Sequence, residues 1–477
     1  MRRRTTSNAI IRAHQALDLG FTEQATRILE DAAAHETAPV SRSQLLVELT
    51  AAYLLAGDEY LDLAAAALDL AGSIRPDSRT EPLSRALHAE LTVLYGHGTV
   101  KVRTLARALR AEGDSRACFH AASALLLADH PEAALRLLRR AQDPANLPPH
   151  LEWRSWSLAG VALEQLGDFK LAARAIRQAV AGAPHGELQE LERLALADCL
   201  LELGDAQSAA TELAVINQEQ LLRDEDHVYR HWLQARAEFE LGNPGLAIQH
   251  YRQARERLSP GHLIPAGVPW DEYGLLAAEA QLLADRGAYA ESILLYRQAC
   301  QAAAPDQLPL TRHELAVVLI ESGDTEAAAQ ELTGLMQDHD YEWRAEVIAE
   351  LADLAFRNGD NQRAEQLALE AIAVRPVPAA YLCLGSIAFE YFRLDEAVSW
   401  FEKAAAESLD GEPAWVAAQQ LLADTYSQMG PESADRLYLH AQLALKYTDQ
   451  RNDWYLPLRS HAESAERALA GQRRLVN

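Results

Sequence analysis

The sequence predicts an all-α solenoid, a row of helix pairs in which each pair packs against its neighbours. Three observations support this fold class. Residues of the hydrophobic set make up 49% of the 477 residues, much of it Ala and Leu, whereas aromatic residues make up 6%. Ala and Leu favour helices, and β-branched and aromatic residues favour strands. No stretch shows a sustained alternation of Val, Ile, Thr and Tyr, and one turn pattern recurs along the chain.

The recurring pattern is a glycine followed by a polar residue, between two apolar helical segments. Clear copies begin at Gly57, Gly167, Gly204, Gly242, Gly323 and Gly359, and looser copies at Gly20, Gly96, Asp129, Gly287, Arg393 and Gly430. Most steps are 33 to 39 residues, and one is 45. Glycine ends a helix in the left-handed conformation without a Cβ clash, and Asp or Asn can cap the next helix. A generic helical bundle would not keep such a period along the chain.

The unit from Trp153 to Gly186 resembles a tetratricopeptide repeat. Trp156 stands in the family's aromatic slot, and Gly160 stands in the small slot where the two helices cross. Matching small and large residues of this and two further units are Ala172, Ile176 and Ala179, then Tyr381, Leu384, Gly385, Ala397, Phe401 and Ala404, then Ala235, Ala247, Tyr251 and Ala254. Small residues let paired helices approach, and large ones fill the space between them. The resemblance implies a right-handed superhelix of about twelve helix pairs, whose first helices line a concave groove.

The charge distribution suggests where the chain divides. Residues 1–186 contain 21 Lys and Arg against 21 Asp and Glu, whereas residues 187–477 contain 23 against 48 and carry the whole net charge of −25. We therefore expect charge-balanced repeats in 1–186, acidic repeats in 187–448 and a C-terminal capping helix in 449–477. The acidic part would repel the phosphates of nucleic acid. It favours a basic partner or serves solubility.

The sequence shows no segment that would address the chain to a membrane. No apolar run reaches the roughly 18 residues that a bilayer span needs. Basic residues follow Met1, but no apolar segment or cleavage site of a signal peptide comes after them. A cytoplasmic protein is therefore expected. The preference for Arg over Lys, together with the abundance of Ala, suggests a bacterial source.

No residue pattern indicates a metal, cofactor or catalytic site. His227 and His231 lie four residues apart and could share a metal ion, but no third ligand is evident, and a solvated helix start is the preferred explanation. The cysteines are widely separated and are interpreted as small buried apolar residues; they are Cys118, Cys199, Cys300 and Cys383. We therefore expect a protein that is not an enzyme and has no cofactor.

Two basic patterns have structural explanations. The segment from Tyr95 to Lys101 slightly resembles a phosphate-binding loop but lacks the required spacing, and it falls where a repeat needs its turn. Short stripes of arginine without interleaved aromatic residues are typical of solvated helix faces, and nucleic-acid binding is the alternative. Their members are Arg103, Arg107, Arg110, Arg136, Arg139 and Arg140.

Candidate partner-binding residues follow from the register of the first helices. Groove-facing positions include Arg116, Phe119, Arg154, Ser157, Asp198, Tyr229, Trp232, Arg236 and Phe239. The last three lie three, seven and ten residues after Tyr229, which places all four on one helix face. Aromatic residues and arginine dominate binding hot spots, although packing of Trp232 or Phe239 between helices is the simpler explanation. The Lys and Asn set with which some family members clamp a carboxylate terminus does not occur at the matching positions.

The connection 259–270 is a second candidate contact. It is rich in Pro and Gly yet contains apolar residues and ends at Trp270, and it accounts for the 45-residue step. Long loops of this kind are often functional. The segment could fold into the groove as a plug or lie on its edge.

The sequence therefore predicts a cytoplasmic scaffold or adaptor that binds a protein or peptide in the groove, with a basic partner favoured by the acidic repeats. Three alternatives stay open. The chain could be a peptide-sensing regulator that acts on a separate effector, it could be an enzyme, or it could self-associate through its repeat ends.

Overall fold

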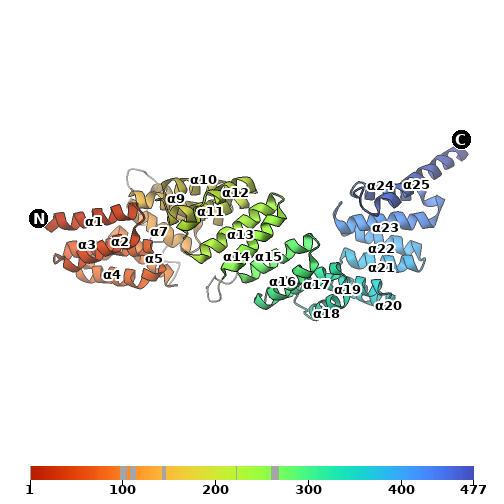
Figure 1. Ribbon diagram of the computed structural model, residues 1–477, viewed down its shortest axis with the longest axis horizontal. Coiled ribbons are helices and arrows are strands. Elements are labelled where there is room, and N and C mark those ends of the chain that lie inside the picture. The colour runs from red at the N-terminus through yellow and green to blue at the C-terminus, as the bar shows by residue number, and fades with distance from the viewer. Residues whose placement is uncertain are drawn as a thin grey trace. The chain divides into compact units, whose positions relative to one another are not determined.

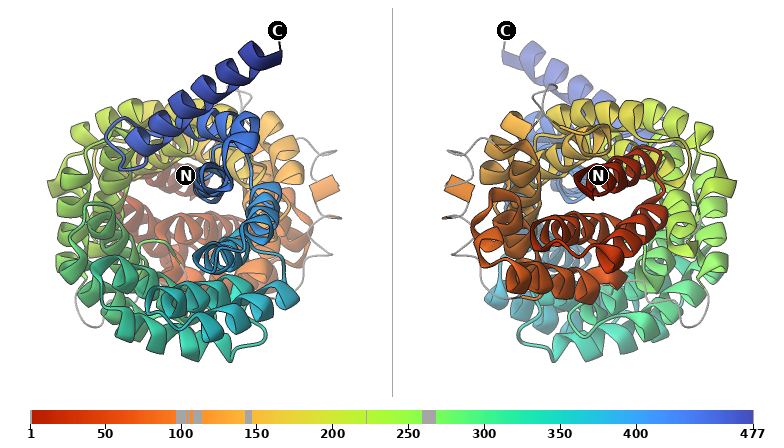
Figure 2. Two further views of the ribbon diagram at one scale, coloured as in Figure 1. Left: turned by 90° about the vertical axis from the view of Figure 1, so that its right-hand side faces the viewer. Right: turned by 90° about the vertical axis from the view of Figure 1, so that its left-hand side faces the viewer.

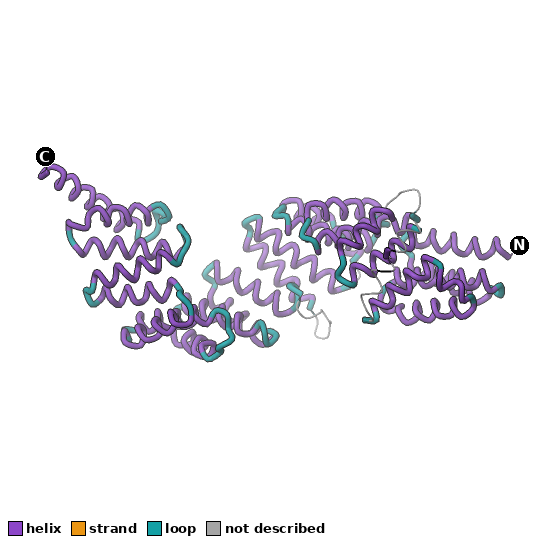
Figure 3. The backbone as a smooth tube through the Cα atoms, turned by 180° about the vertical axis from the view of Figure 1, so that it is seen from behind, coloured by secondary structure: helices purple, strands orange, loops and turns teal. Residues whose placement is uncertain are grey.

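The computed structural model describes residues 2–96, 104, 106–107, 114–141, 147–221, 223–258 and 268–476. Regular structure in these residues consists of 24 α-helices and four short 3-10 helices, with no strand among them (Figure 3). The all-α prediction is confirmed. In the described part of the chain, no helix combines the length and apolar character needed to cross a lipid bilayer.

The chain forms two compact units, of which the first is Met1–Asp271. Its α-helices are α1 Arg2–Asp18, α2 Thr22–His35, α3 Pro39–Ala56, α4 Leu61–Ile74, α5 Pro82–Leu94, α7 Ser115–Leu127, α8 Pro131–Ala141, α9 Pro149–Gln165, α10 Phe169–Gly182, α11 Glu187–Glu202, α12 Ala206–Val215, α13 Asp224–Glu240 and α14 Pro244–Arg257. Its 3-10 helices are η1 Asp58–Tyr60, η2 Pro76–Thr80 and η3 Gln218–Gln220.

The second unit is Glu272–Asn477. Its helices are α15 Glu272–Asp285, α16 Tyr289–Ala302, α17 Leu308–Ser322, α18 Thr325–Met336, α19 Arg344–Arg357, α20 Asn361–Val374, α21 Pro378–Glu390, α22 Leu394–Ala406, α23 Pro413–Met429, η4 Pro431–Ser433, α24 Ala434–Leu445 and α25 Tyr455–Val476. α25 packs on α23 and α24 and buries Leu458, Ala462 and Ala465. The charge-based boundaries at 186 and 448 stay a prediction.

Within each unit the helices pack in consecutive pairs, such as α9 with α10 and α21 with α22 (Figure 1). The first helix of a pair also contacts the first helix of the next pair, as in α7 with α9, α11 with α13 and α19 with α21. The first helices therefore form a shared surface, which we call the first-helix face. This arrangement confirms the predicted solenoid.

The small slots of the repeat lie where paired helices cross. A Cβ at Gly160 of α9 would come within 2.5 Å of the Ile176 side chain on α10, and a Cβ at Gly385 of α21 would overlap the ring of Phe401 on α22. Ile176 and Phe401 are themselves buried. Glycine is required at these crossings because no side chain fits between the helices.

The turns between paired helices use the predicted chemistry. Gly167 has φ of 75°, and the carboxylate of Asp168 accepts a hydrogen bond from the Leu171 N–H at 3.1 Å. The same cap joins Asp205 to Ser208, Asp324 to Ala327 and Asp360 to Arg363. Two turns have another residue in the left-handed position, Asp129 with φ of 57° and Phe392 with φ of 55°. Residues with a Cβ are strained in the left-handed conformation, whereas glycine adopts it freely.

Helix α1 packs on α2, α3 and also α9 of the first unit. Asp18 accepts hydrogen bonds from the backbone N–H of His150 at 3.0 Å and from its Nδ1 at 2.8 Å. The rings of His14 and His150 lie 5.1 Å apart. Seen from its N-terminal end in Figure 2 (right), red α1 lies beside the yellow helices around α9. Contacts between residues more than a hundred positions apart in sequence therefore hold α1 against α9 in the first unit.

Candidate functional site

The first-helix face of α9, α11 and α13 gathers polar and aromatic side chains in the first unit. We call this region the α9–α13 face; its members are Arg154, Ser157, Glu164, Glu192, Asp198, Glu202, Tyr229, Trp232, Arg236 and Trp270. Five of the predicted binding residues belong to this face: Arg154 on α9, and a group of four at its α13 side. The four are Tyr229, Trp232, Arg236 and Trp270.

Three aromatic rings form a cluster at the α13 side of the face. The ring of Tyr229 lies 5.9 Å from Trp232 and 4.4 Å from Trp270, and the two indoles are 5.3 Å apart. These distances are typical of stabilising aromatic pairs. Trp232 is only 8% exposed, whereas Tyr229 and Trp270 are partly exposed. Trp270, which follows the long connection, therefore packs against α13; residues 259–267 of that connection lie outside the described residues.

Asp198 of α11 links this cluster to the neighbouring helix. Its carboxylate accepts hydrogen bonds from the Tyr229 hydroxyl at 2.6 Å and from the Arg236 guanidinium at 3.2 Å. Arg236 also donates to Glu202 at 2.8 Å and lies 4.8 Å from the centre of the Trp232 ring. Burial raises the pKa of Asp198, although Tyr229 and Arg236 both act to lower it. Charge-assisted bonds and the cation–π contact together fix the position of Arg236.

Two carboxylates of the face are close to half protonated at neutral pH. Burial raises the pKa of Glu164 to about 7, with a further contribution from the charge of Asp198. Burial also raises the pKa of Glu192 to about 7, although Ser157 and Arg154 act to lower it. The buried Oε2 atom of Glu192 has no hydrogen-bond partner among the described residues. A donor from a bound partner could satisfy it.

The other predicted binding residues lie apart from the aromatic cluster. Arg154 donates to the His150 carbonyl at 2.7 Å and lies 4.3 Å from the centre of the Trp153 ring. Burial lowers the pKa of Arg154 to about 10, with Glu192 acting in the opposite direction. Arg116 binds both oxygens of Glu48 on α3, and Phe239 is 51% exposed near the end of α13. Their role in partner binding stays a prediction.

Sequence reasoning missed Glu164, Glu192 and Glu202 as members of the face. The signal was present in the helix register, because Glu164 lies seven residues after Ser157, and Glu202 lies four residues after Asp198. Residues three, four or seven apart share one helix face. The register could not show how deeply these carboxylates are buried. Burial decides whether an acidic residue keeps its ordinary pKa or has a raised one.

The structure places one member of the histidine pair beside a third histidine. Among the described side chains, no group of three or more His, Cys, Asp or Glu converges as metal ligands would. The ring of His231 instead lies 5.9 Å from that of His250 on α14, and burial, helped by the charge of Arg230, lowers the pKa of His231 to about 4. His231 is therefore neutral at physiological pH.

The remaining sequence candidates are only partly described. Gly96 has φ of 75°, as a turn requires, whereas residues 97–101 lie outside the described residues. So do Arg103 and Arg110, and the side chain of Arg140 is not described. The cysteines are free thiols, of which Cys118, Cys199 and Cys383 are buried and Cys300 is partly buried.

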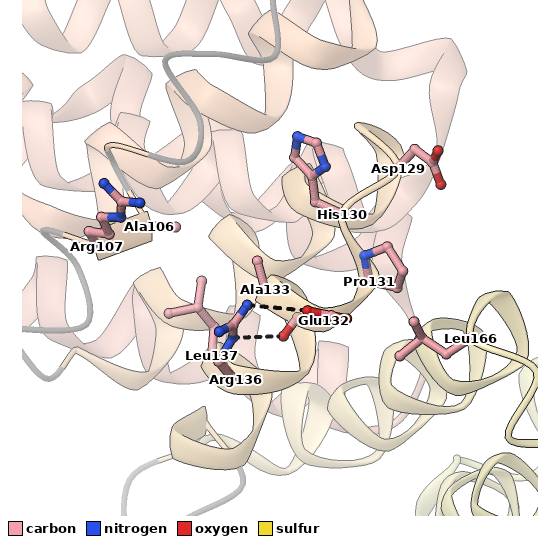
Figure 4. Close-up of a pocket in the computed structure, with 10 residues that line it drawn as sticks. All are labelled: Ala106, Arg107, Asp129, His130, Pro131, Glu132, Ala133, Arg136, Leu137 and Leu166. Atoms are coloured by element: carbon pink, nitrogen blue, oxygen red, sulfur yellow. Dashed lines mark hydrogen bonds and ion pairs between the residues drawn. The ribbon is translucent and has the colours of Figure 1, made fainter.

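A hollow of about 450 Å³ lies beside the turn between α7 and α8 (Figure 4). Arg136 lines this hollow. The Arg136 guanidinium donates to the Glu132 carbonyl at 3.1 Å and pairs with the Glu132 carboxylate at 3.7 Å. The charge of this arginine is thus compensated locally. The α9–α13 face, with more titratable groups and an aromatic cluster, is the stronger candidate site.

Comparison with known families identifies one segment directly. Residues 350–412, which run from within α19 to the residue before α23, match the model of the tetratricopeptide repeat family. No curated protein matches the sequence significantly.

Several solved structures resemble the chain in their helical arrangement. A tetratricopeptide repeat protein from Parabacteroides merdae is 17% identical, with a TM-score of 0.41, over 57% of this chain and 98% of its own. PilF of Pseudomonas aeruginosa is 16% identical, with a TM-score of 0.37, over 50% and 98%. A chain of the APC/C hetero-tetramer Cut9–Hcn1 is 13% identical, with a TM-score of 0.39, over 95% of this chain and 95% of its own. At these TM-scores the family assignment rests on the matched segment and the helix pairs, which confirm the resemblance noted in the sequence.

Proposed function

The chain is a tetratricopeptide repeat protein, and we propose that it is a non-catalytic adaptor that binds a basic protein or peptide segment on the α9–α13 face. Repeats of this family generally mediate contacts between proteins. The observation that carries the proposal is the charge of the face, on which four carboxylates stand against two arginines beside three aromatic rings.

The chemistry of the face suits a cationic side chain. Arg236 pairs with Asp198 and Glu202, and the charge of Arg154 partly compensates Glu192. Burial and neighbouring carboxylates raise the pKa of Glu164 without an opposing basic group. A lysine or arginine of the partner would favour the ionised form of Glu164 and Glu192 and could donate to the free Oε2 of Glu192. The aromatic cluster offers ring faces for the same cation or for apolar neighbours.

The test compares labelled peptides of opposite charge by fluorescence anisotropy. We would use a Lys- and Arg-rich peptide with interspersed Leu and a counterpart with Glu in place of the basic residues. The double variant Glu164→Gln with Glu192→Gln should weaken binding of the basic peptide about fivefold or more. The matched control is Glu365→Gln, an exposed position on α20 of the second unit.

The pH dependence separates the site from general attraction to an acidic protein. Affinity of the wild type for the basic peptide should rise from pH 6 to pH 8, because Glu164 and Glu192 lose their protons near pH 7. The double variant should bind with little change over the same range. Equal affinity of the double variant and the wild type, or a flat profile for the wild type, would show that the partner binds elsewhere.

The partner itself can be sought with the same variants. Proteins captured from the native cell by the wild type and by Glu365→Gln, but lost from the double variant, would be the candidates. Trp270→Ala offers a second, uncharged disruption of the face.

A further inference from the structure

A second depression lies away from the α9–α13 face, where α8, α9 and α10 meet. We call it the α8–α10 groove. It measures about 640 Å³ and is lined by Leu135, Leu138, Arg139, Trp156, Ala159, Leu163, Leu171, Arg174, Ala175, Arg177 and Gln178. Its size lies within the range of about 300–1,000 Å³ that ligand sites usually occupy.

The floor of the groove is apolar and continuous with the core. Leu138, Ala159 and Ala175 are buried and belong to the hydrophobic cluster of this part of the first unit. Trp156 and Leu163 pack on the same cluster but stay partly exposed. A concentration of accessible apolar groups in a hollow is a feature of interaction sites rather than of ordinary surface.

The rim of the groove is basic. Arg139, Arg174 and Arg177 are exposed, and none of the described residues that line the groove is Asp or Glu. Arg139 and Arg174 form no ion pair with another described residue. The charge of Arg177 is partly compensated by Asp205, whose pKa is lowered mainly by hydrogen bonds from Ser208 and less by Arg177. The rim therefore presents cationic groups with little internal compensation.

We propose that the α8–α10 groove docks an acidic amphipathic segment of a partner protein. Its Leu- or Phe-type side chains would fill the apolar floor, and its carboxylates would pair with the guanidinium groups of the rim. Charge complementarity identifies this occupant. Residues 187–477, which carry the whole net charge of −25, would repel it, and they lie beyond the helices of the groove in the sequence.

The shape and chemistry of the groove disfavour nucleic acid as its occupant. A phosphate backbone has no apolar groups to cover Trp156, Leu163 and Leu171, which stay accessible in the groove. Single strands bind by stacking their bases on exposed aromatic rings, whereas the groove contains one partly exposed indole, Trp156.

The decisive variant is Leu171→Glu. Leu171 is 43% exposed in the groove and is the third residue of α10, where a carboxylate is compatible with the capped helix start. The substitution should therefore preserve the fold while placing a negative charge at the mouth of the groove. The second variant is Arg139→Gln with Arg174→Gln, and the control is Arg297→Gln, at an exposed position on α16 of the second unit.

The probe is a labelled helical peptide with Leu and Phe on one face and Glu on the other. We expect Leu171→Glu to weaken its binding at least tenfold and the double arginine variant to weaken it about three- to tenfold. The control variant, and the Glu164→Gln with Glu192→Gln variant of the α9–α13 face, should bind it as the wild type does. This last comparison keeps the two surfaces distinguishable.

Three outcomes would overturn the proposal. The first is equal binding of the Glu peptide and of a counterpart with Lys in place of Glu to the Glu164→Gln with Glu192→Gln variant, in which the α9–α13 face no longer attracts the Lys peptide; the groove would then select apolar groups alone. The second is wild-type affinity of Leu171→Glu with its helical circular dichroism intact. The third is a dimer in light scattering that Leu171→Glu dissociates, which would identify a second copy of the chain as the occupant.

Discussion

Glu48 of α3 is the carboxylate at which three helices of the first unit converge. It is 8% exposed and accepts hydrogen bonds from Arg116 of α7 at 2.9 and 2.6 Å. His14 of α1 lies 3.1 Å from the same carboxylate. The variant Glu48→Gln keeps the shape of the side chain but removes its charge and leaves one acceptor oxygen for the two guanidinium nitrogens.

The size of the effect follows from the pKa of Glu48. Burial by itself would raise this pKa, but His14 and Arg116 together outweigh burial and lower it from 4.5 to about 2. At about 1.4 kcal/mol for each pKa unit, the folded state favours the ionised form by roughly 3 kcal/mol. Breaking a fully buried pair costs about 3–5 kcal/mol. Because Arg116 is partly exposed, we expect Glu48→Gln to lower the stability of the first unit by about 2–3 kcal/mol.

Hydrogen exchange measured on the full chain can test this value. Amides of α1, α3 and α7 should exchange faster in Glu48→Gln at pH 7, while those of the second unit keep their protection. The folded pKa lies below the unfolded one, so the stabilisation is complete above about pH 5 and is lost as pH falls toward 2. In urea unfolding, the difference in the free energy of unfolding between wild type and Glu48→Gln should therefore become smaller from pH 6 to pH 3.

The control is Glu59→Gln, at an exposed position on η1 of the same unit. A loss below about 0.5 kcal/mol at pH 7, in the range of an ordinary surface substitution, would refute the assignment of a buried ionised carboxylate. A difference in the free energy of unfolding that stays constant between pH 6 and pH 3 would also refute it, because the loss of stability would then arise from packing and not from charge.

Two further substitutions test the repeat geometry of the second unit. Gly385→Ala should lower the free energy of unfolding by about 1–3 kcal/mol in thermal melts, because the new Cβ overlaps the buried ring of Phe401; unchanged stability would mean that the ring can rotate away. Phe392→Gly should raise stability by about 1 kcal/mol, because Phe392 has φ of 55° and the residue is 79% exposed. A lower melting temperature for Phe392→Gly would instead indicate that the ring makes contacts worth more than the relieved conformation.

Local chemistry explains what could be predicted from the sequence. The fit of Gly160 against Ile176 and the cap of Asp168 on Leu171 depend on residues within one helix pair, so their spacing reveals them. Phe392 shows the limit of this approach, because it adopts the left-handed conformation in a turn that the pattern placed one residue later, at Arg393.

Contacts between distant helices could not be predicted in this way. The pairs Glu48 with Arg116 and Asp18 with His150 join residues 68 and 132 positions apart. No repeat period encodes such pairs, since they depend on how neighbouring pairs stack. The same holds for Glu164 and Glu192, because only the packing of α9 and α11 determines that their carboxylates are desolvated.

Helix α9 carries both proposed surfaces, and its geometry shows why they can act separately. At about 100° per residue, Arg154, Ser157 and Glu164 point within one sector of the helix, and Trp156, Ala159 and Leu163 point roughly opposite. The first set faces the α9–α13 face and the second lines the α8–α10 groove.

Such a helix has no single apolar stripe in its sequence, because opposite sides of it are needed for different contacts. The two surfaces also differ in charge, so a ligand drawn to one is repelled by the other. If both surfaces bind, saturation with the acidic peptide should leave the affinity for the basic peptide within about twofold, since sites without shared partners are nearly additive. A larger change would mean that α9 transmits strain between its two sides and that the surfaces work as one coupled site.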